Sequence, residues 1–253
     1  MRTSEQVALN RKITTFTKAK LASGEVWSQD DMTYVQLYTG AGGLKMVEAS
    51  DTAILSEFYT PDAIVQRMWA LAEKHGFAGG RILEPSAGVG RFLRYVDPAN
   101  STVRAFEMDD ISGNILKACF PWADVTIGEF ETIFYPNGLG GKRVMPPADF
   151  DLVIGNPPYG KRLGDYQGKA KESGYTLAST IDQYFVEKGV QLLKSGGLLV
   201  FIIPSGFLQN DSKYNSLKDY LYREANLLDA YRMPLGIFDY TSIASDIIVL
   251  QKK

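Results

Sequence analysis

The sequence is short of the side chains on which several kinds of chemistry depend. Cys119 is its single cysteine and His75 its single histidine. One cysteine cannot form an internal disulfide, which indicates a reducing, cytoplasmic setting. One histidine excludes a histidine-rich metal centre and argues against a Ser-His-Asp triad. His75 itself stands just before Gly76, a position typical of an ordinary polar residue near a helix C-terminus.

Long apolar runs and a basic surplus are also absent. The longest apolar run, residues 197–203, has the length of a strand, whereas a membrane helix needs about 20 residues. The N-terminus lacks the basic-then-apolar pattern of a signal peptide. The formal net charge of −2 does not indicate tight, unaided binding of nucleic acid, because such binding usually comes with a basic surplus. We expect no membrane partner and no resident metal.

What the sequence does contain is an alternation of strand and helix patterns. A hydrophobic share of 45% and a charged share of 22% over 253 residues suit one large α/β domain. Residues 1–50 form a helical, partly polar N-terminal extension in this reading. Strands are expected at 81–84, 102–107, 124–127, 151–155, 198–203, 225–231 and 246–251, with helices at 61–71, 89–96, 109–119, 180–193 and 213–225. This alternation predicts a Rossmann-like α/β fold with a seven-stranded, mostly parallel sheet covered by helices on both faces.

A glycine-rich turn, residues 84–92, follows the first expected strand. In a doubly wound fold this is where a nucleotide-type ligand binds. Gly88 and Gly90 can adopt a positive φ, and the small residues around them let the backbone approach a ligand. Leu93 stands where the dinucleotide fingerprint has Gly or Ala, so a pyrophosphate cradle is not indicated. The turn suits a ligand without phosphates, such as the amino-acid end of S-adenosylmethionine, although an ordinary strand-to-helix turn would have the same pattern.

Acidic residues follow the next two strands. Glu107 comes 19 residues after Gly88, at the end of the second expected strand, where a carboxylate can accept hydrogen bonds from ribose hydroxyls. The neighbouring Met108 can cover one face of an adenine. Glu129 and Phe130, after the third strand, offer a carboxylate for an adenine amino group and an aromatic ring beside it. Taken alone, Glu129 could equally be a solvated loop acid.

The sharpest motif is Asn156-Pro157-Pro158-Tyr159, directly after the fourth expected strand. An aromatic amine is a poor nucleophile because its lone pair is delocalised into the ring. The side-chain oxygen of Asn156 and the carbonyl of Pro157 can draw such an amine toward tetrahedral geometry. The two prolines fix φ and hold these acceptors in place before a substrate arrives. Tyr159 can stack on the plane of a base.

In this order the motifs resemble those of N6-adenine DNA methyltransferases of the gamma arrangement. In that arrangement a Thr-Pro segment precedes the glycine turn and Asn-Pro-Pro-Tyr follows it. The matching segments are 58–61, 83–90, 106–109, 128–130, 154–159, 196–204, Phe238 and 243–248. The resemblance covers residues 55–253 and implies a class I, S-adenosylmethionine-dependent methyltransferase. Its catalytic domain would be residues 51–253.

The resemblance implies roles for particular residues. It assigns the methionine part of the cofactor to Thr60, Glu84, Pro85, Ala87 and Gly88, and the ribose and adenine to Glu107, Met108, Glu129 and Phe130. The target amine would be bound by Asn156 and Pro157, with Pro158 stiffening the turn. Chemistry on a duplex base requires flipping it out, and Tyr159 and Phe238 would stack on that base. Glu129 stands where the family usually has Asp, and Tyr240 could serve in place of Phe238.

None of these motifs is expected to recognise a particular DNA sequence. Members of the family usually have a separate target-recognition domain after the last strand of the sheet, whereas this sequence ends at Lys253. We expect recognition to come from residues 1–50, from the long loop 160–179, from a partner chain or from a part outside this sequence. The stretch Tyr38-Thr39-Gly40-Ala41-Gly42-Gly43-Leu44 also resembles a segment of very large mobile-element proteins that carry helicase domains.

Three other functions fit the sequence less well than DNA adenine methylation. Cytosine C5 methylation needs a cysteine nucleophile, usually after proline, whereas Cys119 follows Ala118 in an expected helix. Asn-Pro-Pro-Tyr also serves protein glutamine and RNA guanine N2 methyltransferases, but the segment 58–68 ahead of the glycine turn favours the adenine group. A non-catalytic, cofactor-binding subunit of a larger complex is the third alternative.

Overall fold

The computed structural model describes residues 3–39, 59–138, 142–160, 178–209, 211–234 and 244–253. The helices of these ranges are α1 (Thr3–Ser23), α2 (Gln29–Val35), α3 (Asp62–Lys74), α4 (Asp110–Cys119), α6 (Ile181–Leu192) and α7 (Asn215–Glu224). The strands are β1 (Gly80–Glu84), β2 (Ser101–Glu107), β3 (Asp124–Ile127), β4 (Phe150–Gly155), β5 (Leu193–Pro204), β6 (Ala225–Arg232) and β7 (Ser245–Lys252). Phe238 and Tyr240 lie outside the described residues, as does most of the loop 160–179.

The strands form one seven-stranded sheet in the order β3-β2-β1-β4-β5-β7-β6. The first five strands are parallel, and β7 pairs antiparallel with both β5 and β6. The predicted α/β fold with a mostly parallel sheet is therefore confirmed. Strand order reverses between β1 and β4, which makes their carboxyl ends the switch point at which ligands bind in such sheets.

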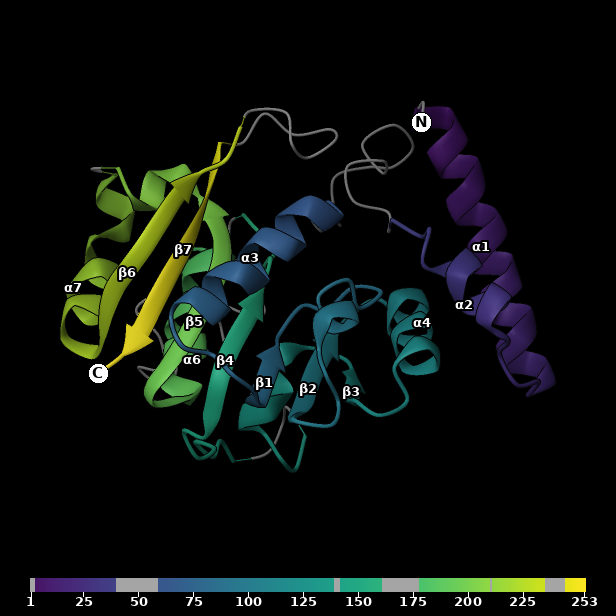
Figure 1. Cartoon of the computed structure of the whole chain (residues 1–253), viewed down its shortest axis with the longest axis horizontal. Helices are drawn as coiled ribbons and strands as arrows, with labels where there is room; N and C mark the ends of the chain where they lie inside the picture. The colour runs from purple at the N-terminus through teal and green to yellow at the C-terminus, as the bar shows by residue number, and fades with distance from the viewer. Residues whose placement is uncertain (1–2, 40–58, 139–141, 161–177, 210, 235–243) are drawn as a thin grey trace.

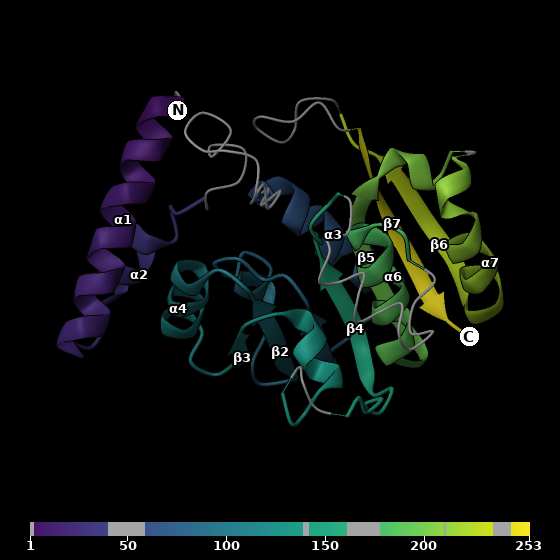
Figure 2. The same ribbon diagram turned by 180° about the vertical axis from the view of Figure 1, so that it is seen from behind.

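Helices cover both faces of the sheet, as predicted (Figure 1). Because side chains alternate along a strand, β5 sends Leu198, Val200 and Ile202 into a core shared with α3. The intervening Leu199 and Phe201 enter the second core, on the side of α6. Seen from behind, α6 and α7 lie over the half of the sheet formed by β5, β6 and β7 (Figure 2). Burial on both faces explains the nearly continuous apolar runs in β4 and β5.

The N-terminal helices pack at the β3 end of the molecule, against α4 (Figure 1). Ile13 of α1, Val35 of α2 and Ile115 of α4 are fully buried in one small cluster, which Tyr38 and Val89 complete. Ser28 begins α2 with a capping box in which its hydroxyl accepts from the Asp31 backbone amide. The division into an extension and a catalytic domain stays a prediction, but the two share this apolar contact.

One expected helix, 89–96, is wrong. The chain there forms irregular turns and a single 3₁₀ turn, Leu93–Tyr95. Gly88 and Gly90 have φ of +56° and +84°, a left-handed conformation that a right-handed helix cannot contain. Gly90 also packs so closely that an added Cβ would lie 2.5 Å from the Phe120 ring and 2.6 Å from Leu116. Tertiary contact with α4 therefore overrides the helical pattern.

Among the described residues, no helix is both long enough and apolar enough to cross a bilayer.

Candidate functional site

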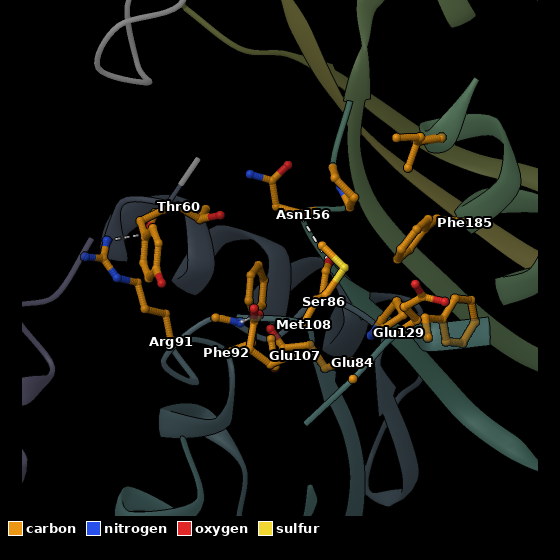
Figure 3. A pocket seen from close by; sticks show the side chains of 18 residues that line it. Thr60, Glu84, Ser86, Arg91, Phe92, Glu107, Met108, Glu129, Asn156 and Phe185 are labelled. Carbon is orange, nitrogen blue, oxygen red and sulfur yellow. Dashed lines mark hydrogen bonds between the residues drawn. The ribbon is translucent and has the colours of Figure 1, made fainter. Parts of the chain in front are cut away.

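A pocket opens at the carboxyl ends of β1, β2 and β4, at the switch point of the sheet (Figure 3). The empty space within it, including the part open to solvent, is about 990 Å³. The lining comes from six regions of the chain: Tyr59 and Thr60 before α3; Glu84 to Gly88 with Arg91 and Phe92; Glu107 and Met108; Gly128 to Phe130; Asn156 and Pro158 after β4; and Ile181 and Phe185 of α6. In Figure 3, Thr60 and Arg91 lie at one end and Glu129 and Phe185 at the other.

Glu107 holds the glycine turn in place. One carboxylate oxygen accepts from the Gly88 amide at 2.7 Å and the other from the Asp109 amide at 2.8 Å. The Ala87 amide donates to the backbone oxygen of Phe106 at 2.9 Å. Glu107, which was predicted to bind the ribose, thus also holds the glycine turn in place.

Glu84 is buried in the pocket wall, and one of its carboxylate oxygens lacks a hydrogen-bond partner within the described part of the chain. Its side chain is 1% exposed, and its Oε2 has no hydrogen-bond partner among the described residues. Burial, with a smaller contribution from the charge of Glu107, raises the pKa of Glu84 well above its ordinary range. A buried carboxyl group without a partner is costly. A ligand that brings a positive charge to Glu84 would remove that cost.

The far end of the pocket is aromatic. Phe130 lies 5.2 Å from Phe185 of α6 between ring centroids, and 5.6 Å from Phe106 of β2. Glu129 precedes Phe130 and is partly exposed, while Met108 is 43% exposed at the pocket surface. Phe185 was not predicted as a site residue, because its pattern in the sequence is that of any core residue of an amphipathic helix.

The Asn-Pro-Pro-Tyr turn contributes unequally to the lining. Asn156 and Pro158 border the pocket, whereas Pro157 and Tyr159 are not part of its described lining. The Asn156 backbone oxygen accepts from the Ser86 hydroxyl at 3.2 Å, which ties this turn to the glycine turn. Tyr159 is 5% exposed, and its hydroxyl donates to Asn156 Oδ1 at 2.9 Å. Burial raises the pKa of Tyr159, so the phenol stays protonated and stays a donor. Stacking of Tyr159 or Phe238 on a base remains a prediction.

Two further lining residues, Tyr59 and Arg91, have no role assigned by the resemblance. The Arg91 guanidinium donates from Nη1 to the Thr60 backbone oxygen at 2.9 Å. It also lies 5.1 Å from the centroid of the Tyr59 ring. Arg91 is the single basic residue of the described lining, which otherwise carries the carboxyl groups of Glu84, Glu107 and Glu129. The end of the pocket at Thr60 is therefore the end suited to an anionic group.

The described residues contain no group of three or more His, Cys, Asp or Glu side chains arranged to hold a metal ion.

Comparison with known proteins places this pocket in context. The family model described as Eco57I restriction-modification methylase matches residues 103–238. The "Defense against restriction protein B" of Escherichia phage P1 is 30% identical over 235 residues, covering 92% of this chain but 10% of that protein. The Type II methyltransferase M.TthHB8I of Thermus thermophilus is 33% identical over 182 residues, covering 67% of this chain and 39% of that protein. The chain thus spans less than half the length of either relative.

Solved structures with the same fold give a consistent result at low identity. A protein from Listeria monocytogenes assigned to the class I S-adenosylmethionine-dependent methyltransferases superposes with a TM-score of 0.65, at 16% identity, over 99% of this chain and 87% of that one. A type I restriction-modification methyltransferase subunit from Streptococcus thermophilus gives 0.63, at 22% identity, over 78% and 44%. At these identities the likeness establishes the fold alone.

Proposed function

Since the chain belongs to the Eco57I restriction-modification methylase family of S-adenosylmethionine-dependent DNA methyltransferases, we propose that it methylates the exocyclic N6 of adenine in DNA. The observation that carries this proposal is the position of Asn156. Its side chain borders the same pocket as Glu84, Glu107 and Glu129, and the prolines that follow it stiffen the turn. A rigid amide acceptor beside a cofactor pocket is what methylation of an aromatic amine requires.

The chain's residues fit S-adenosylmethionine along the length of the pocket. Glu84, buried and with no hydrogen-bond partner for its Oε2 in the described ranges, is suited to the positive charge of the methionine part. Thr60 and the basic Arg91 lie at the same end (Figure 3), where a carboxylate would be accommodated. Glu107 would take the ribose hydroxyls, and Met108, Phe130 and Phe185 would enclose the adenine with Glu129 near its amino group. When bound, this cofactor supplies a methyl group already activated on a sulfonium.

The acceptors of the Asn-Pro-Pro-Tyr turn would then orient the target amine. Asn156 Oδ1 already accepts from the Tyr159 hydroxyl, and in this proposal it also accepts an N–H of the substrate, since an amide oxygen can accept two hydrogen bonds. The Pro157 carbonyl would accept the other N–H, so that the nitrogen lone pair points toward the methyl group. Because both acceptors are fixed beforehand, little reorganisation is needed on binding. The proton lost by the alkylated nitrogen passes to solvent.

The target base must leave the duplex to reach this turn. Phe238 and Tyr159 are the proposed stacking partners, and the ring of Tyr159, 5% exposed, would have to turn outward to take that role. We assign choice of the DNA sequence to a separate recognition domain or partner chain. This assignment is supported by the net charge of −2 and by the small share of each relative that the chain spans.

Replacing the amide tests this proposal. Asn156→Ala removes one of the two acceptors, and we expect the initial rate of labelled methyl transfer from S-adenosylmethionine to mixed-sequence DNA to fall by about 100-fold or more. Asn226→Ala is a matched control, because Asn226 is exposed on the edge strand β6. The Asn226→Ala protein should retain the wild-type rate, and both variants should bind the cofactor. Equal rates in Asn156→Ala and wild type would contradict the assignment.

A further inference from the structure

Tyr59 forms the pocket wall beside the glycine turn. An added Cβ on Gly88 would lie only 3.3 Å from the Tyr59 ring, so the ring borders the space that a side chain at position 88 would need. The Tyr59 hydroxyl is 2.9 Å from the Ser112 hydroxyl of α4, and Ser112 is itself held by the Asp109 carboxylate at 2.9 Å. The ring therefore occupies one defined position at the methionine end of the pocket.

Arg91 supports the same ring from the glycine turn. Its guanidinium lies over the Tyr59 ring at 5.1 Å, close enough for a cation–π contact. Arg91 also donates to the backbone oxygen of Thr60, the residue after Tyr59, and so holds that residue in place. Tyr59 and Thr60 are thus clamped against the turn that holds Gly88. This clamp lies entirely within the part of the chain that resembles a methyltransferase.

Tyr38 reaches the same ring from outside that part. It follows α2 in the N-terminal extension and meets Tyr59 edge to face, with 6.5 Å between centroids and 90° between planes. Tyr38 is 6% exposed and belongs to the buried cluster formed by Ile13, Val35 and Ile115. In Figure 1 the chain leaving α2 turns back toward the sheet. The extension is therefore in direct contact with a residue that lines the pocket.

We propose that Tyr38 is a positioning residue for the cofactor, through which the N-terminal extension sets the affinity of the pocket. The proposal rests on the cofactor assignment of the proposed function but on neither adenine nor DNA as acceptor. Tyr38 does not border the pocket. It acts by limiting the positions of the Tyr59 ring, and pre-ordering a binding wall lowers the cost of ligand binding. Losing it should weaken ground-state and transition-state binding alike, which raises KM and leaves kcat unchanged.

Isothermal titration of the full chain with S-adenosylmethionine tests the proposal. Tyr38→Leu removes the ring, and an aromatic pair of this kind predicts roughly a threefold to tenfold weaker Kd. Tyr38→Phe keeps the ring and should restore affinity to within about twofold of wild type. Tyr34→Leu is the matched control, because Tyr34 belongs to the same cluster but packs on Phe16 at 5.4 Å rather than on Tyr59.

The outcomes separate this proposal from the proposed function. A Tyr38→Leu protein that binds as tightly as wild type overturns it. So does an equal loss in Tyr34→Leu, because that result would mean that the extension acts only through overall stability. A wild-type chain that binds the cofactor but methylates no DNA refutes the proposed function and leaves the titration decisive for Tyr38. A wild-type chain that does not bind the cofactor overturns both.

Discussion

At the scale of the residue, three carboxyl groups line the pocket, and they differ in burial and in hydrogen bonding. Glu107 has both oxygens bonded to backbone amides, Glu84 is buried with an unpartnered oxygen, and Glu129 is partly exposed. Before a ligand binds, the carboxylate of Glu107 is therefore hydrogen-bonded to the protein and that of Glu129 can be solvated. Glu84 is the exception, because its buried Oε2 has no hydrogen-bond partner among the described residues and a cationic ligand would supply a favourable charge.

Glu84 should therefore reduce the stability of the ligand-free protein at high pH. Its raised pKa means that the folded state keeps a proton which the unfolded chain releases above a pKa of about 4.3. Stability from this group is present below that pH and is lost as pH rises. We expect Glu84→Gln to melt at a higher temperature than wild type at about pH 8, with the difference vanishing below about pH 4.

The same substitution, Glu84→Gln, should also weaken binding of the cofactor. Titration with S-adenosylmethionine should show Glu84→Gln binding at least about tenfold more weakly, because a charged partner is replaced by a neutral one. Glu73→Gln, at an exposed position of α3, is the control and should change neither quantity. Unchanged affinity in Glu84→Gln would show that the cation of the ligand binds elsewhere.

The residues that could be predicted from the sequence as pocket residues are polar side chains placed at the ends of apolar strands. Glu84 and Glu107 end β1 and β2, Asn156 directly follows β4, and the fold brings all three to one edge of the sheet. Phe185 and Tyr59 could not be found in this way. Phe185 looks like any core residue of a helix, and the role of Tyr59 depends on contacts with Gly88, Arg91 and Ser112 that only the folded chain creates.

At the scale of the element, the strands were predictable because burial on both faces gives them compact apolar runs. The strand expected at 151–155 is β4, Phe150–Gly155, and the one at 246–251 is β7, Ser245–Lys252. The helix expected at 89–96 failed for a non-local reason. Its path is decided by the fit of Gly90 against Leu116 and Phe120 of a later segment, which no local pattern encodes.

Gly90 provides a direct test of that reason. Gly90→Ala combines a left-handed φ of +84° with a Cβ placed 2.5 Å from the Phe120 ring, and we expect a loss of about 2–4 kcal/mol in the free energy of unfolding. Gly24→Ala is the control: its φ is +67°, but its Cβ would meet nothing within 4 Å, so about 1 kcal/mol is expected. Urea unfolding measures both. Similar losses would mean that close packing at Gly90 is unimportant.

At the scale of the whole molecule, a predicted sheet carries a pocket at its switch point and an N-terminal extension packed at its β3 end (Figure 1). The alternation of strands and helices was enough to predict the sheet. It could not predict which surface the extension would cover, because that depends on the match between Ile13, Val35 and Ile115. Through Tyr38 this contact reaches the pocket, so the extension and the cofactor site form one physical unit.

The most direct test of the central claim is to identify the methylated product. Mixed-sequence DNA, RNA and protein acceptors would be incubated with the chain and labelled S-adenosylmethionine, and the DNA digested to nucleosides and analysed by mass spectrometry. We expect the label to appear in N6-methyladenine of DNA. Label in methylcytosine, in RNA or in protein, or cofactor binding without any methylated product, would contradict it.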